Sequence, residues 1–189
     1  MNADTTYAPG TGRAGVVTGV LASAFEGDAL AAWLFPDLAR RAGYQEGFYR
    51  SLLEHPGAES YLAGESGASI WLRLGAGESL RQDGPTAGPL ARLAGLGAAL
   101  AQRHPVDPHL YLAVMGVAAG FQGRGIGSAL LERRLELADR DGEAAYLEAS
   151  SPGSRALYLR HGFADLGEPV RFEDAPPIFP MWRNAAAVK

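Results

Sequence analysis

The stretch of this sequence best suited to chemistry is GFQGRGIG, residues 120–127, in which four glycines separate two apolar segments. Glycine lacks the Cβ atom that would hold a ligand away from the backbone. Amides at the start of a helix have no partner within the helix and carry partial positive charge. The stretch therefore predicts a phosphate site, in which amides from Gly123 to Ser128 face the anion and Arg124 adds charge. A strand-to-helix turn without a ligand is the alternative.

Two common phosphate motifs do not fit this stretch. A P-loop ends in Gly-Lys-Ser/Thr, and GRGIGS (123–128) has no lysine. The dinucleotide fingerprint GxGxxG follows a strand directly, whereas Gly123, Gly125 and Gly127 lie several residues beyond one. The pattern Q/R-x-x-G-x-G/A is the one that Gln122, Gly125 and Gly127 satisfy.

That pattern resembles the coenzyme A pyrophosphate motif of the GNAT acetyltransferase superfamily. VMGVAAGFQGRGIGSALL (114–131) is similar to the family's fourth strand, loop and helix, and YLEASSPGSRALYLRHGF (146–163) to its next strand and helix. The spacing from Glu148 to Tyr158 is most similar to the puromycin N-acetyltransferase branch. The specific resemblance covers about residues 109–166, with a weaker echo in AFEGDALAAWLFPD (24–37).

The resemblance implies a fold and a set of cofactor-binding residues. The fold is α/β (α+β), with a mixed, mostly antiparallel sheet flanked by helices and a splayed central strand pair. Acetyl-CoA is expected on strand amides, on the glycine loop and on one helix residue. These residues are Met115, Gly116 and Val117; Gln122, Gly123, Arg124, Gly125, Ile126, Gly127 and Ser128; and Ser154. The branch usually has Asn at the position of Ser154. Serine can still cap the helix, but it has no side-chain amide to bond to pantetheine.

The reaction implied by the resemblance is direct acetyl transfer from acetyl-CoA to an amine. Glu148 is expected to act as general base, through water, because an amine attacks only as its free base. Tyr158 is placed to donate a hydrogen bond or a proton to the leaving thiolate. Since the chain has no cysteine and no GxSxG motif, we expect no covalent acetyl-enzyme. The alternative for Glu148 is a carboxylate at the end of a strand without a catalytic role. The alternative for Tyr158 is an aromatic residue of the core.

The branch resemblance favours a small molecule as acceptor, with a primary amine, such as an aminonucleoside or another antibiotic. A protein N-terminus or lysine is the alternative acceptor, and a non-catalytic acyl-CoA-binding module is the alternative class. Candidate residues of the acceptor pocket, which can equally be core residues, are Phe25, Trp33, Phe35 and Tyr49.

Composition limits the class of protein. The 189 residues are 47% hydrophobic and 20% charged, which is typical of one globular domain. The formal charge of -4 argues against a nucleic-acid partner. No apolar run is long enough for a membrane span, and the start of the chain lacks a signal-peptide pattern, so we expect a cytoplasmic protein. A monomer or a homodimer is expected. No metal is expected, because the chain has no cysteine and its histidines lack metal-ligand spacing: His55, His104, His109 and His161.

The elements that position these residues follow from apolar periodicity. Residues 1–13 are expected as a polar tail without a clear first strand, and 14–189 as a single domain. Helices are expected over 16–34, divided at Gly27-Asp28 with Asp28 as N-cap, and over 39–53, 90–102, 128–140 and 154–160. Strands are expected over 61–63, 69–74, 109–117 and 144–150, and at 178–182 as a proline-bearing edge.

The apolar pattern also predicts which residues are buried in one strand and in the helix that follows it. HLYLAVMGV (109–117) is apolar on both alternating faces, which is typical of a central strand in a covered sheet. On the helix that follows, Leu130, Leu131, Leu137 and Ala138 are expected to share the buried face. Glu132, Arg133, Arg134 and Glu136 are expected on its solvated face.

Overall fold

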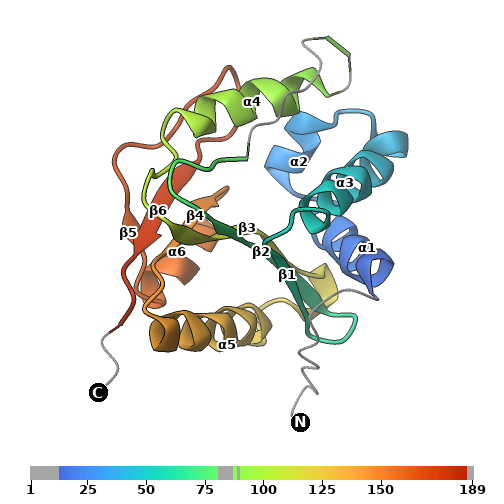
Figure 1. Ribbon diagram of the computed structural model, residues 1–189. Coiled ribbons are helices and arrows are strands. Elements are labelled where there is room, and N and C mark those ends of the chain that lie inside the picture. The colour runs from blue at the N-terminus through green and yellow to red at the C-terminus, as the bar shows by residue number, and fades with distance from the viewer. Residues whose placement is uncertain (1–12, 81–86, 89, 187–189) are drawn as a thin grey trace.

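A mixed sheet forms the centre of the protein (Figure 1). In a computed structural model, which describes residues 13–80, 87–88 and 90–186, this sheet has six strands. Their order is β1 (Ala58–Leu62), β2 (Gly67–Leu74), β3 (His109–Val117), β4 (Ala145–Ala149), β6 (Phe179–Arg183) and β5 (Ala164–Asp165). All neighbours are antiparallel except β3 and β4, which are parallel. The expected α/β class and the central place of 109–117 are confirmed.

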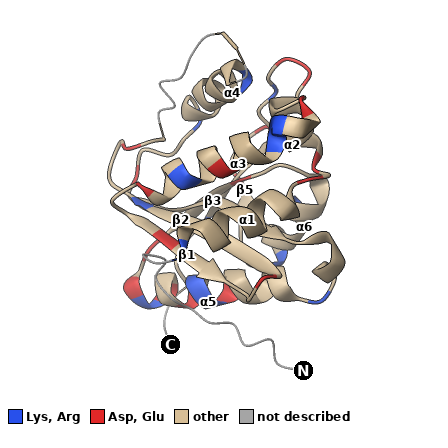
Figure 2. Ribbon diagram, turned by 90° about the vertical axis from the view of Figure 1, so that its right-hand side faces the viewer, with Lys and Arg blue, Asp and Glu red and all other residues tan. Residues whose placement is uncertain are grey.

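Helices cover both faces of the sheet (Figure 1). One face carries α1 (Ala14–Ala24) and α3 (Leu38–Leu53), with α2 (Ala29–Leu34) and α4 (Ala91–Ala101) beside them. The other face carries α5 (Ile126–Asp141) and α6 (Pro152–Arg160). Acidic and basic residues are interspersed along α3 and α5 (Figure 2). No helix of the described part of the chain is long and apolar enough to span a membrane.

Local sequence signals explain where several helices begin and end. Asp28 caps α2, because its side chain accepts a hydrogen bond from the amide of Ala31 at 2.9 Å, as the sequence predicts. Asp37 caps α3 in the same way through the amide of Ala39. Gly142 ends α5 in the left-handed conformation, with φ of 69°, which glycine adopts without steric cost.

The core lies in two layers, one on each side of the sheet. Leu21 of α1 and Leu52 of α3 pack with Ile70 and Leu72 on one face. On the other face, leucines of α5 and Tyr158 of α6 pack with the alternate residues of β3 and β4. Full burial of one such leucine stabilises the fold by about 1.5–3 kcal/mol. This two-sided packing holds β3 rigidly between the helical layers.

The structure corrects two sequence-based expectations about exposure. Arg134 is 1% exposed and not part of a solvated face, since its guanidinium bonds to Glu59 at 2.8 Å and contacts Glu143 at 3.4 Å. On the same helix Leu135, rather than Leu137, lies in the core.

The proline-bearing strand β6 is not at the sheet edge, because the two-residue β5 lies outside it. The predicted tail lies outside the described residues except for its last position.

Candidate functional site

The glycine loop leads from the end of β3 into α5. Gly123 and Gly125 have φ values of 72° and 80°, a conformation that favours glycine, and the space around the missing Cβ of each is open. The first helical bond runs from the amide of Ala129 to the carbonyl of Gly125 at 3.0 Å. The amides of residues 126–128 therefore precede the helical ladder and can bind an anion. The loop therefore has the geometry of the phosphate site that the sequence predicts.

Side chains of the same loop have separate contacts. The Gln122 amide nitrogen donates to the carbonyl of Val117 at 3.0 Å, which ties the loop to the end of β3. The Arg124 guanidinium lies 5.5 Å from the ring centre of Phe121. The Ser128 hydroxyl pairs with the ring of His161 at 3.1 Å, so its amide is the group that faces a ligand. Gln122 therefore positions the loop, and Arg124 is the loop's cation.

The central strand pair separates beside this loop. β3 pairs with β4 only over Leu110–Leu112 and Ala145–Leu147. From Ala113 onward, that edge of β3 has no strand beside it among the described residues. The splay predicted from the family resemblance is present.

The β2–β3 ladder decides which amides of β3 face the splay. Ala118 donates its amide proton to the carbonyl of Ser66, just beyond the Gly67–Val117 pair. That pair is therefore of the non-hydrogen-bonded type, and the amides of Val117 and, by alternation, Met115 face away from β2. The amide of Gly116 faces β2.

Gly116 has a different structural requirement from its neighbours. A Cβ atom at this position would lie 2.7 Å from the Cβ of Ala24 and 2.8 Å from the ring of Phe25. Such distances are far inside van der Waals contact. Gly116 thus allows the end of α1 to approach β3 and to form one wall of the site.

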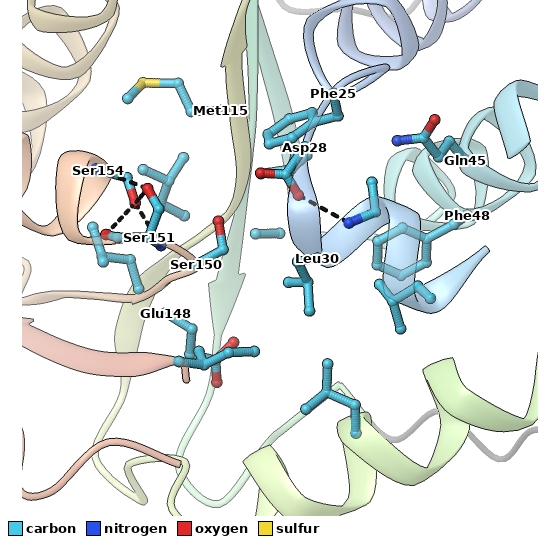
Figure 3. Close-up of a pocket in the computed structure, with 18 of the residues that line it drawn as sticks. Phe25, Asp28, Leu30, Gln45, Phe48, Met115, Glu148, Ser150, Ser151 and Ser154 are labelled. Atoms are coloured by element: carbon cyan, nitrogen blue, oxygen red, sulfur yellow. Dashed lines mark hydrogen bonds between the residues drawn. The ribbon is translucent and has the colours of Figure 1, made fainter. Parts of the chain in front are cut away.

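Two hollows adjoin at the splay. One, of about 490 Å³, runs past Gly116, Val117 and Gln122. The other, of about 260 Å³, lies between the helices of one face and the ends of β3 and β4 (Figure 3). We call them the donor groove and the acceptor cavity. Phe25, Asp28 and Met115 line both, so the two hollows meet there.

Glu148 projects into the acceptor cavity from the end of β4 (Figure 3). Its carboxylate accepts hydrogen bonds from the hydroxyls of Tyr111 at 2.6 Å and Tyr146 at 3.0 Å. Burial, followed by the charge of Glu148, raises the pKa of both tyrosines, which remain neutral donors. The site thus holds a fixed carboxylate with 9% of its side chain exposed.

Two histidines lie behind this carboxylate. Nδ1 of His104 is 3.9 Å from Glu148, and its Nε2 is 3.1 Å from Nε2 of His109. Nδ1 of His109 is 2.7 Å from the carbonyl of Asp107, which only accepts, so this nitrogen carries a proton. Burial lowers the pKa of His109, whose Nε2 then accepts from His104. His104 thus lies between Glu148 and His109, hydrogen-bonded to His109 and beyond hydrogen-bond distance of the carboxylate.

Tyr158 lines the acceptor cavity from α6. It is 7% exposed and packs edge-on against Phe163, with ring centres 5.9 Å apart. Burial raises the pKa of its hydroxyl above the ordinary range. Tyr158 therefore presents a neutral O–H group.

Ser154 does not cap α6, contrary to the possibility raised by the sequence. Ser151 is the N-cap, and its hydroxyl accepts from the amide of Ser154 at 3.1 Å. The hydroxyl of Ser154 in turn accepts from the amide of Ser151 at 3.2 Å, which completes a capping box. Both serines line the acceptor cavity (Figure 3). Coenzyme contact by Ser154 stays a prediction.

The aromatic candidates separate into two groups. Phe25, Phe35 and Tyr49 line the acceptor cavity, whereas Trp33 is not among its lining residues. The indole of Trp33 donates to Asp174 at 2.6 Å and lies beneath the Arg92 guanidinium, 5.0 Å from the ring centre. Trp33 is thus better explained as a core residue that holds α2.

Sequence reasoning did not place Asp28 and His104 beside these hollows. Asp28 had a capping signal only, and His104 had no partner at a recognisable spacing. Both reach the site through tertiary packing, which no local pattern encodes. In the described residues there is no group of three or more side chains suited to a metal ion.

Comparison with known proteins agrees with this geometry. Residues 86–163 match the family model of the acetyltransferase (GNAT) family. A histone acetyltransferase HPA2 and related acetyltransferase from Corynebacterium glutamicum is 24% identical, with 98% of each chain covered and a TM-score of 0.70. Arylalkylamine N-acetyltransferase 2 from Aedes aegypti is 16% identical over 97% of this chain and 100% of that chain, with a TM-score of 0.72. At these identities the structural likeness shows the fold alone.

Proposed function

We propose that this chain, whose residues 86–163 match the model of the acetyltransferase (GNAT) family, is a member of that family and transfers the acetyl group of acetyl-CoA to a primary amine of a small molecule. The observation that carries the proposal is the junction at Met115. There a groove beside a phosphate-binding loop meets a cavity that contains a buried carboxylate. Acetyl-CoA supplies an activated acyl group at this junction. The puromycin N-acetyltransferase branch remains a prediction.

The donor groove and the glycine loop that continues from it together offer backbone donors at both ends of the coenzyme. The amides of residues 126–128 hold the pyrophosphate, and Arg124 adds a positive charge. The amides of Met115 and Val117, which face away from β2, lie at the thioester end of the coenzyme. An amide directed at the acetyl oxygen stabilises the negative charge that develops there, and loss of one such donor typically costs about 2.7–4 kcal/mol.

Glu148 acts as the general base of the proposed reaction. It takes a proton from the ammonium form of the acceptor, directly or through water, and leaves a free amine. The amine nitrogen then bonds to the acetyl carbon as the carbon–sulfur bond breaks. Of the two protons that the ammonium loses, one leaves through Glu148 and the other ends on the thiol.

Tyr158 stabilises the leaving thiolate as a hydrogen-bond donor. A thiol has a pKa of about 8.5 by analogy with cysteine. The pKa of Tyr158 is raised above 10 by burial, so complete proton transfer from its hydroxyl to the thiolate is unfavourable. The hydrogen bond, rather than the proton, is the contribution that this geometry favours.

Two measurements test the proposal. Acetyl-CoA should raise the melting temperature, by an amount that grows with its concentration. Thiol release should then follow when acetyl-CoA is mixed with a panel of small primary amines, aminonucleosides and short peptides. Stabilisation without thiol release would favour a non-catalytic binding module, and release with peptides alone would favour a protein acetyltransferase. Absence of stabilisation would contradict the proposed site.

A further inference from the structure

The acceptor cavity has an apolar lining with charge of one sign. Its carboxylates are Asp28 and Glu148, and no lysine or arginine of the described residues lines it. Apolar side chains from α2, α3, α4 and the segment before β6 form one side of the wall, and neutral hydroxyl and amide side chains, such as those of Gln45 and Ser150, line other parts. The apolar residues include Leu30, Leu34, Phe48, Leu93, Leu96 and Ile178.

Asp28 lies at the junction of the acceptor cavity and the donor groove. One carboxylate oxygen, Oδ1, accepts from the amide of Ala31 and so caps α2. The other oxygen has no hydrogen-bond partner among the described residues, and the side chain faces the cavity (Figure 3). The cap fixes this carboxylate in place and leaves one of its oxygens available to a ligand.

Among the described residues, no lysine or arginine forms an ion pair with Asp28. Arg41 packs beside the same turn, but it donates to the backbone carbonyls of Phe35 and Glu26, at 2.9 Å and 3.1 Å. Tyr49, whose hydroxyl accepts from Gln45 at 3.4 Å, is buried in the neighbouring wall. Burial raises the pKa of Tyr49, and the negative charge of Asp28 raises it further.

We propose that the acceptor is an organic ammonium ion with an apolar body and no anionic group, and that Asp28 is its counter-ion at the junction. This inference rests on the proposed function. It places the ammonium between Asp28 and Glu148 beside Met115, with the apolar body directed toward Leu96 and Ile178. The rings of Phe25 and Phe48 add a cation-binding face.

The lining explains what the cavity excludes. A carboxylate on the acceptor would meet two carboxylates, with no lysine or arginine among the described lining residues to compensate, and such like-charge contacts are unfavourable. A peptide would place backbone amides against Leu30, Leu34 and Leu96, where they would lose their hydrogen bonds to water. Amino acids and peptides are therefore predicted to be poor acceptors, whereas the decarboxylated amines of similar shape are good ones.

The first arm of the test uses three acceptors of one shape. These are 2-phenylethylamine, phenylalanine and phenylalaninamide, which differ at a single substituent. We expect kcat/KM for phenylethylamine to exceed that for phenylalanine at least roughly 100-fold. Phenylalaninamide, which masks the charge but keeps the bulk, should fall nearer to phenylethylamine. Equal turnover of phenylalanine would overturn the inference.

The second arm tests Asp28 directly. Asp28→Asn removes the charge and keeps a side chain that caps helices well. KM for phenylethylamine should rise roughly tenfold or more, with little change in melting temperature, because the ammonium loses its charged partner while the helix cap is kept. Asp37→Asn is the matched control: it changes another helix cap, lies outside both hollows, and should leave KM within about twofold. An unchanged KM in Asp28→Asn would overturn the assignment.

The outcomes separate this inference from the proposed function. Acetyl-CoA binding together with turnover of acidic amines or peptides alone overturns the acceptor class and leaves the donor site intact. Neither stabilisation by acetyl-CoA nor thiol release with any acceptor overturns both. If Asp28→Asn fails to fold, the comparison of the three acceptors on the unaltered protein still decides the acceptor class.

Discussion

The donor half and the acceptor half of the site are built in different ways. The backbone donors of the donor half come from one continuous stretch, residues 109–128, which contains β3, the glycine loop and the start of α5. The acceptor half combines Asp28 before α2, Tyr49 of α3, His104 after α4 and Glu148 of β4. Backbone amides dominate the first half, and side chains dominate the second.

The two halves of the site therefore place different requirements on the sequence. Amides need only a backbone path, which glycine positions and strand alternation determine locally. The acceptor half needs particular side chains on elements that tertiary packing brings together. A related chain can therefore change its acceptor by substitutions in α2, α3 or α4 while the donor loop stays the same.

Among variants that change only one half of the site, Glu148→Gln is expected to have the largest effect on activity. Tyr111 and Tyr146 donate to different oxygens of Glu148, so the single amide oxygen of glutamine keeps one of these two bonds, and it no longer takes a proton from the acceptor. We expect kcat to fall roughly 10²–10⁴-fold, the usual range for loss of a general base. The KM for acetyl-CoA, measured by steady-state thiol release, should change little because the donor half is intact.

A control variant makes the result specific to the cavity. Glu132→Gln removes a carboxylate from the exposed face of α5, where 61% of the side chain is exposed, and should leave kcat unchanged. If Glu148→Gln and Tyr158→Phe both keep rates within about twofold of the unaltered protein, the two proposed roles are wrong.

The same contrast explains how much the sequence could predict. β3 was predicted at His109–Val117, and Asp28 as a helix cap, because apolar alternation and capping are local signals. The buried Arg134 was missed, because its partner Glu59 is 75 residues away in the chain. Likewise, nothing near His104 in the sequence indicates that Glu148 lies beside it. Distant pairs of this kind depend on packing that periodicity does not determine.

A smaller effect, confined to the donor half, is expected from Gly125→Ala. Gly125 has φ of 80°, and a side chain there costs roughly 1–2 kcal/mol although the space around it is open. We expect the KM for acetyl-CoA to rise roughly 5- to 30-fold, while the KM for the acceptor stays near its original value. Gly120→Ala is the control, since that residue has no positive φ and equally open surroundings. A rise in the acceptor KM alone would contradict the division into halves.

The smallest effect is expected from His104→Gln, in the acceptor half. The proposed role of His104 is to pass a proton from Glu148 to His109, and water can replace it in part, so kcat should fall less than about tenfold. Burial lowers the pKa of His109, so the neutral ring that accepts this proton persists below the ordinary histidine value of about 6.5. Activity of the unaltered protein should therefore decline as the pH falls through that lowered pKa.

The pH profile distinguishes proton transfer from mere packing around His104. In His104→Gln the acid limb of kcat/KM should move to lower pH, because His109 is no longer connected to Glu148. A variant that only loosens the cavity would lower the rate by the same factor at every pH. Parallel profiles of kcat/KM against pH for the two proteins would therefore show that His104 supports the position of Glu148 without carrying its proton.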